Sequence, residues 1–273
     1  MVDPVVSIAA AEAAKTGGGV LSRLLGPTAD EMGVQLQEWY RRKNVERVAR
    51  QAEAKASTGT AGSIPPRVAA EVFEKAQWAD DDFVAEYLSG VLASSRTPDG
   101  TDDRGVAWTA LVGRLSADQL RLHYIMYRAF RKLALGLEYE ALSDVLQRPL
   151  VFQASEIITA MKLSYEVESI YRVLEALYGL SAEGLVGEQF QHGGADFLNK
   201  ANQDRYDFPG FVGDLFVVYA TTRGSTLFLH AHGRGLDWAA AITDPATDLV
   251  VDWPDGEEVA DVGARWKEDF KIA

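Results

Sequence analysis

The chain has 273 residues and no cysteine. This absence excludes disulfide bonds, zinc sites built on thiolates and a cysteine nucleophile. It also agrees with a cytoplasmic location, which we expect for this protein.

Long hydrophobic runs are missing as well. No window approaches the roughly 18 uninterrupted apolar residues of a membrane-spanning helix. The first residues, MVDPVVSIAAAEAAKTGGG, lack a basic leader and carry acidic residues within the apolar run, unlike a secretory signal peptide. We therefore expect a soluble protein without a transmembrane segment.

Positive charge is scarce. The formal net charge is −13, and residues 181–273 carry more than twice as many acidic as basic side chains. Such a chain is repelled by the phosphate backbone of DNA or RNA. A nucleic-acid partner is therefore not expected, whereas a protein partner is.

What the sequence does contain is a series of helical patterns. Gly26 ends one apolar turn, and Pro27 stands where a new helix tolerates proline best, so a long helix is predicted from Pro27 to about residue 57. Ser116 and Gln119 form a capping box for another helix. Further helices are predicted over residues 66–77, 82–95, 106–114, 117–135, 137–147, 151–163 and 169–178.

The C-terminal third mixes helices and strands. Strands are predicted at 184–190 and 214–220, separated by a long Gly-rich segment. Residues 221–233 fit either a helix or the second arm of a hairpin. We favour the helix because helix–strand–wing–strand–helix is the order of a winged-helix module.

These patterns predict a mostly α protein: an N-terminal helical bundle, a small winged-helix-like α+β module and an irregular acidic C-terminal tail. The predicted segments are 1–62 (N-terminal helices and a polar linker), 63–165 (helical bundle), 166–235 (winged-helix-like module with the Gly-rich insert) and 236–273 (acidic tail).

One basic stretch is dense enough to suggest an interaction surface. It consists of Trp39, Tyr40, Arg41, Arg42, Lys43, Arg47 and Arg50. The alternative is an exposed helix face on which charges pair along the helix, because Glu46 and Arg50 are four residues apart. The apolar residues beside it also allow a homo-oligomer, or they are part of the core.

No catalytic constellation is recognisable, so we predict no catalytic residue, no cofactor and no metal. The alternative is a metal site at His230 and His232 with Asp237, since both imidazoles would share one face of a strand. On a helix they would point apart. The carboxylates at 80–82 and 98–105 are better explained by helix capping and by an exposed loop than by metal binding.

Several segments together resemble a known family. Gly26-Pro27 leads into the basic stretch Tyr40–Asn44, the acidic helix start Asp81–Ala93 follows, and Thr221–Gly233 reads TTRGSTLFLHAHG. Over residues 20–235 their order is similar to that of the Abi-alpha (abortive-infection alpha) proteins of bacteria. The resemblance implies a role in phage resistance and supplies no catalytic residue.

We therefore expect a non-enzymatic phage-defence protein that acts through protein contacts as a sensor or growth-arrest effector. Two alternatives stay open. One is a nucleic-acid-binding regulator that uses the winged-helix-like module or the basic helix 41–50. The other is an enzyme whose site is assembled from distant residues.

Overall fold

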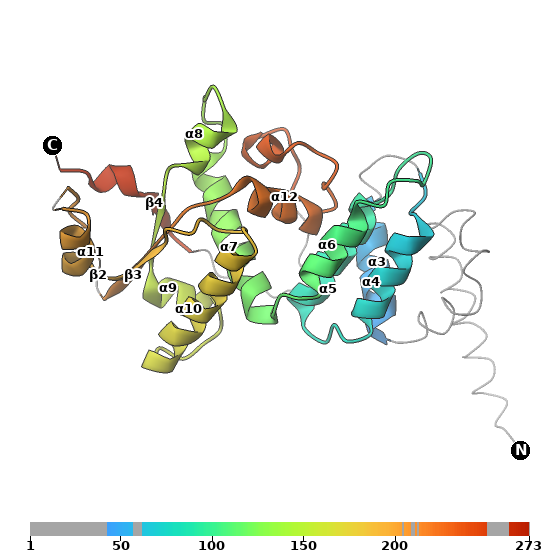
Figure 1. The fold of residues 1–273 in the computed structure, drawn as a ribbon, viewed down its shortest axis with the longest axis horizontal. Coiled ribbons are helices and arrows are strands. Elements are labelled where there is room, and N and C mark those ends of the chain that lie inside the picture. Colours follow the sequence, from blue (N-terminus) through green and yellow to red (C-terminus); the bar gives the residue numbers. More distant parts are fainter. Residues whose placement is uncertain are drawn as a thin grey trace, which may run out of the picture. The chain divides into compact units, whose positions relative to one another are not determined.

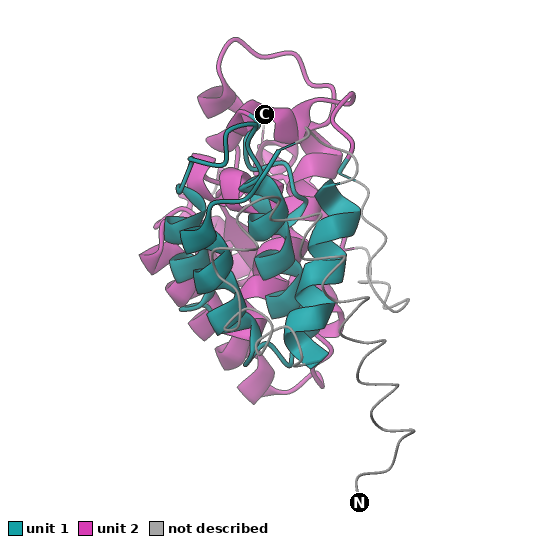
Figure 2. Cartoon of the chain, turned by 90° about the vertical axis from the view of Figure 1, so that its right-hand side faces the viewer, with its two compact units in different colours: residues 1–115, 230–237, 249–254 teal, residues 116–229, 238–248, 255–273 magenta. Residues whose placement is uncertain are grey.

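The computed structural model describes residues 43–56, 62–203, 205–208, 211, 213–249 and 262–272. They form a mostly helical structure with one antiparallel sheet (Figure 1), so the prediction of an α-dominated fold is confirmed. The chain divides into two compact units (Figure 2). The described part of unit 1 is 43–56, 62–115, 230–237 and 249, and unit 2 comprises the other described residues.

Helices make up most of the described part of unit 1. They are α3 (Lys43–Ala56), α4 (Pro66–Ala76), α5 (Asp82–Ser94) and α6 (Gly105–Val112). Helices α4, α5 and α6 begin within one residue of the predicted starts. Proline opens α4, and the Asp81 side chain caps α5 by accepting the backbone N–H of Phe83 at 2.8 Å. The predicted helix junction at Gly26-Pro27 lies outside the described residues.

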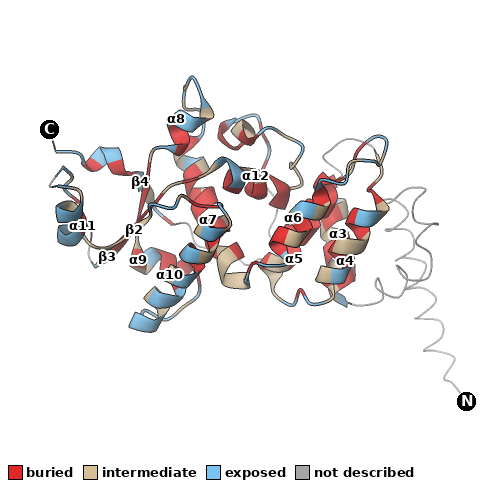
Figure 3. Cartoon of the chain, in the orientation of Figure 1, coloured by how far each residue is buried: buried red, intermediate tan, exposed pale blue. Residues whose placement is uncertain are grey.

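Helix α5 is the centre of unit 1. It packs against α3, α4 and α6, and all its residues from Ala85 to Ser94 are buried (Figure 3). At Gly90, a Cβ atom would overlap the carbonyl oxygens of His230 and Ala231. Glycine is therefore required there, because it lets the backbone of residues 230–231 lie directly on α5.

Unit 2 contains a sheet with the strand order β2-β3-β1-β4, in which every neighbouring pair is antiparallel. The strands are β1 (Leu150–Gln153), β2 (Gln191–Gly194), β3 (Asp214–Val218) and β4 (Ala264–Trp266). Phe152 lies opposite Phe216, and Leu150 lies opposite Trp266. Because paired residues share a face, these aromatic rings lie on one side of the sheet.

Both faces of the sheet are covered. On the side of Trp266, the ring of Phe130 from α7 (Ala117–Ala134) lies edge-on to the indole at 6.1 Å. The opposite side forms an apolar cluster with α11 (Ala195–Ala201) and the 3-10 helix η4 (Lys267–Phe270). The buried members of that cluster are Val151, Leu198, Phe208, Leu215, Val217 and Phe270.

The remaining elements of unit 2 surround this core. They are α8 (Leu142–Leu146), α9 (Ala154–Ala160), α10 (Val167–Ala182), the 3-10 helix η2 (Ala239–Thr243) and the first part of α12 (Thr222–Ala231). The predicted capping box of α7 is confirmed, with the Ser116 side chain and the Gln119 side chain each accepting the other residue's backbone N–H. The helical interpretation of 221–233 is also confirmed by α12.

Four local predictions differ from the structure. Residues 184–190 form no strand and contribute only the bridge between Val186 and Ala220, while β2 lies in the segment expected to be a loop. The helix predicted at 151–163 begins as β1, and the helix predicted at 137–147 shrinks to α8. A short apolar run such as that of β1 does not distinguish a helix from a strand. Strand β2 has the sequence QHGG, which has no strand pattern of its own, and it depends on pairing with β3.

Part of the segment expected to be an irregular tail is ordered into the fold. Residues 264–266 form β4, and residues 239–243 and 267–270 form 3-10 helices. Across the described residues, no helix combines the length and the apolar composition needed to cross a membrane.

Candidate functional site: the Trp238 groove

The basic stretch is only partly within the described residues. Trp39, Tyr40, Arg41 and Arg42 lie outside them. In the described remainder, Lys43 is exposed, Arg47 forms an ion pair with Asp82 at 2.5 Å, and Arg50 forms an ion pair with Glu46. Arg50 thus pairs along its own helix, whereas Arg47 pairs with a carboxylate of α5.

The two histidines of LHAHG lie at the end of α12 and are both buried. The His230 ring lies 4.7 Å from the ring of Trp108, measured between centroids. Burial lowers the pKa of His230 to about 3, and the positive charge of Arg104 contributes to the shift. His230 is therefore a neutral part of the core of unit 1 at physiological pH.

Asp237, the third residue of the alternative metal site, is engaged elsewhere. Its carboxylate forms an ion pair with Arg234 at 2.6 Å. Within the described ranges, no group of three or more His, Asp or Glu side chains is arranged to hold a metal ion. The histidine His123 is buried in unit 2, where its Nε2 lies 3.1 Å from the carbonyl oxygen of Gly224.

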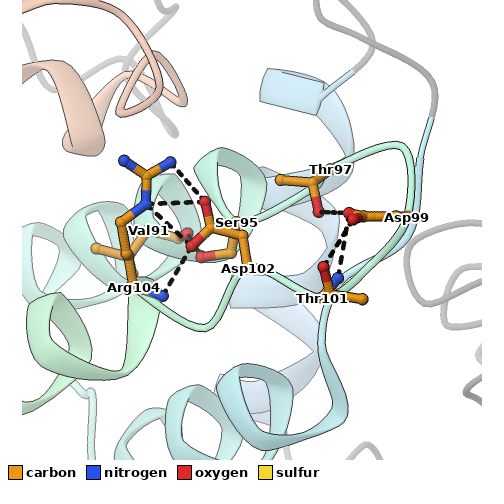
Figure 4. A network of polar contacts seen from close by, with 7 residues as sticks. All are labelled: Val91, Ser95, Thr97, Asp99, Thr101, Asp102 and Arg104. Atoms are coloured by element: carbon orange, nitrogen blue, oxygen red, sulfur yellow. Dashed lines mark hydrogen bonds and ion pairs between the residues drawn. The ribbon is translucent and has the colours of Figure 1, made fainter.

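Two carboxylates of the acidic loop before α6, those of Asp99 and Asp102, are engaged within the loop (Figure 4), whereas Asp103 forms an ion pair with Arg67 of α4. Asp99 accepts hydrogen bonds from Thr101 and Thr97, which lower its pKa. Asp102 pairs with Arg104, and this hydrogen bond lowers the pKa of Asp102. The carboxylates of Asp99 and Asp102 thus have partners within the loop itself.

A different feature stands out in unit 2, which we call the Trp238 groove. It is a cavity of about 600 Å³ formed where the segment after α7 faces the segment around η2. Its lining comprises Gly136, Leu137, Glu138, Tyr139, Trp238, Ala240, Ala241, Thr243, Asp244 and Pro245. Trp238, which lines this cavity, is 83% exposed, an unusual position for so large an apolar residue.

The wall made by residues 239–248 is held by one arginine. Arg131, in the last turn of α7, donates to the carbonyl oxygens of Ile242 at 2.6 Å and Thr247 at 2.7 Å. Longer contacts of 3.4 Å reach the carbonyl oxygens of Ala241 and Asp244. Because a rigid guanidinium offers several donors in fixed directions, it can hold a turn of irregular backbone in one conformation.

The opposite wall is tied to the first by two further contacts. The hydroxyl groups of Tyr139 and Thr243 are hydrogen-bonded, and the backbone N–H of Gly136 donates to the carbonyl oxygen of Thr243 at 3.0 Å. Gly136 has a φ of +74°, which glycine adopts without strain. The backbone of Trp238 is fixed as well, since its carbonyl oxygen accepts the N–H of Ala241 at 2.8 Å.

The electrostatic character of the groove is negative. Glu138 and Asp244 are its ionisable lining residues, and both are exposed. Glu138 forms no ion pair with any described residue. Arg131 lies behind the wall, near Asp244 and Asp248, and offsets part of this negative charge.

A second cavity, of about 500 Å³, lies in unit 2 beside the start of α12. Thr221 lines it and is held by Tyr127, whose hydroxyl accepts the Thr221 N–H at 2.8 Å and donates to the carbonyl oxygen of Leu185 at 2.6 Å. Burial raises the pKa of Tyr127 to about 12. The side chains around this cavity share no single charge or chemistry that would specify a ligand.

Sequence reasoning missed the groove. From the sequence, Trp238 is predicted only to belong to an acidic tail. The two walls of the groove are about 100 residues apart in the sequence, so no local pattern brings them together. No family model, curated protein or solved structure matches this chain. The resemblance to the Abi-alpha proteins therefore rests on the quoted motifs alone.

Proposed function

We propose that this protein acts in bacterial defence against phage by binding another protein, as a sensor or growth-arrest effector without chemistry of its own. The observation that carries the proposal is the Trp238 groove. An exposed tryptophan beside a preformed cavity is typical of surfaces that a protein partner covers. The phage-defence setting comes from the order of the Abi-alpha-like motifs.

A nucleic-acid partner has less support. The net charge of −13 opposes binding to phosphate backbones, and Arg47 and Arg50 are each paired with a carboxylate. The same negative charge would attract a protein surface that presents basic side chains.

We also propose that the C-terminal part of the chain contains a winged-helix-like module. The order α10, β2, α11, β3, α12 supports a winged-helix-like arrangement of residues 166–235, although β1 and β4 come from outside that segment. A helical bundle in the preceding segments and a cytoplasmic location complete the proposal.

The test is phage plating on a bacterial host with and without the gene, across a broad panel of phages, together with a growth assay on overexpression. We expect reduced plaque counts for at least one phage or arrested growth. Unchanged plaque counts with unchanged growth would contradict the proposed function.

A further inference from the structure

We propose that the Trp238 groove binds an arginine side chain presented by an exposed segment of a partner protein. This inference rests on the proposed function, because it specifies the chemistry of the expected protein partner. The lining residues of the groove all belong to unit 2.

Trp238 and two acidic residues line the same cavity. Trp238 is 83% exposed, and Glu138 and Asp244 are exposed lining residues of the same cavity. An indole attracts a cation over its ring, and a carboxylate accepts charge-assisted hydrogen bonds from it. Together these groups favour a cationic group that also has a flat apolar surface.

Arginine fits this combination better than lysine. Its planar guanidinium stacks on an aromatic ring and at the same time donates in a fork to a carboxylate, whereas the lysine ammonium is a compact, strongly hydrated charge. The aliphatic stem of arginine would also lie along the apolar lining formed by Leu137, Ala240 and Pro245.

The groove is held ready for such a group. Arg131 fixes the wall 239–248 through backbone carbonyls, and the contacts of Thr243 with Tyr139 and Gly136 join the two walls. A preformed site loses less conformational entropy when it binds. The indole provides the selectivity for a guanidinium over other cations.

The test uses the full chain and three capped peptides that differ only at the central residue, which is arginine, its neutral analogue citrulline, or lysine. Binding is followed by NMR through the indole N–H signal of Trp238, assigned by its loss in Trp238→Phe. We expect a saturable shift of this signal with the arginine peptide, and binding at least about tenfold weaker for citrulline and a few-fold weaker for lysine.

Two variants of equal charge separate the groove from general attraction to an acidic protein. Glu138→Gln/Asp244→Asn removes both carboxylates of the groove, and Glu175→Gln/Asp196→Asn removes two exposed carboxylates that do not line it. We expect about fivefold or greater loss of arginine-peptide affinity in the first variant and less than about twofold in the second. An unchanged amide spectrum elsewhere verifies that each variant is folded.

The inference is overturned if the arginine peptide leaves the Trp238 signal unshifted at several millimolar, if citrulline or lysine binds equally well, or if both double variants lose affinity alike. Free arginine amide serves as a fourth probe. If it binds as tightly as the arginine peptide, the ligand of the groove is a small guanidinium compound rather than a segment of a protein, which also overturns the inference. Phage plating is a separate readout. Peptide binding without any phage phenotype would refute the proposed function alone, and a phage phenotype without peptide binding would refute this inference alone.

Discussion

Single buried ionisable residues determine how unit 1 responds to pH and to substitution. His230 is the clearest case, because its ring is enclosed and its pKa is lowered to about 3 by burial. An unfolded chain would bind a proton at this side chain near pH 6.5, whereas the folded chain would not. The stability that the neutral ring contributes is therefore present above about pH 6.5 and is lost progressively as the pH falls toward 3.

We predict that His230→Phe makes unfolding less sensitive to acid. Phenylalanine keeps a ring beside Trp108 and cannot take up a proton. Between about pH 6.5 and 4, the free energy of unfolding should fall less steeply in the variant, by up to about 1.4 kcal/mol per pH unit. Urea unfolding at a series of pH values measures this difference. A wild-type His230 that titrates near pH 6.5 in an NMR experiment would refute the prediction.

A buried ion pair is the second residue-scale feature. Lys55 Nζ lies 2.6 Å from the Glu86 carboxylate, and the two side chains are 1% and 2% exposed. The ammonium also donates to the Ser89 hydroxyl at 2.9 Å and to the carbonyl oxygen of Ala231 at 2.7 Å. Burial lowers the pKa of Lys55, and Glu86 opposes this shift.

Breaking this pair should be costly, whereas replacing both partners should not. We predict that Lys55→Met lowers the free energy of unfolding by about 3–5 kcal/mol, because Glu86 is left buried without its counter-ion. The double variant Lys55→Met/Glu86→Leu should recover most of this loss. The control is Arg67→Met, which removes an exposed ion pair with Asp103 and should cost less than about 1 kcal/mol. Equal losses in Lys55→Met and the double variant would contradict the account.

At the scale of elements, most helices and strand β3 were predictable, whereas β1, β2 and β4 were not. Pro66, Asp81 and the Ser116/Gln119 pair set helix starts through local chemistry that the sequence displays. Strand β2, by contrast, has two glycines in four residues and exists through its pairing with β3, which is not a local property. The groove was unpredictable for the same reason, since its walls come from distant segments.

The segment around η2 depends on one residue of another element. We predict that Arg131→Met lowers the free energy of unfolding by about 2–4 kcal/mol, because backbone carbonyls of residues 241–247 lose a charged donor. It should also increase amide hydrogen exchange across residues 239–248. Lys200→Met, at an exposed position of α11, is the control for loss of one positive charge. Unchanged exchange in Arg131→Met would show that the wall is held by other contacts.

At the scale of the whole molecule, the chain combines strong negative charge, a buried Lys55–Glu86 ion pair, a buried neutral His230 and the exposed Trp238 groove. The strong negative charge disfavours nucleic acids and favours a basic protein surface. The histidines that sequence reasoning kept as a metal-site alternative lie buried, with the ring of His230 beside Trp108. Function is therefore expected to depend on the groove rather than on the histidine pair.

The most direct measurement is phage plating with wild-type protein and with Trp238→Ala. The side chain is 83% exposed, so its removal should change the free energy of unfolding by no more than about 0.5 kcal/mol and leave the protein level unchanged. The account predicts that wild-type protein lowers plaque counts and that Trp238→Ala abolishes this protection at equal protein level. Full protection by Trp238→Ala would contradict the central claim that the protein works through this groove.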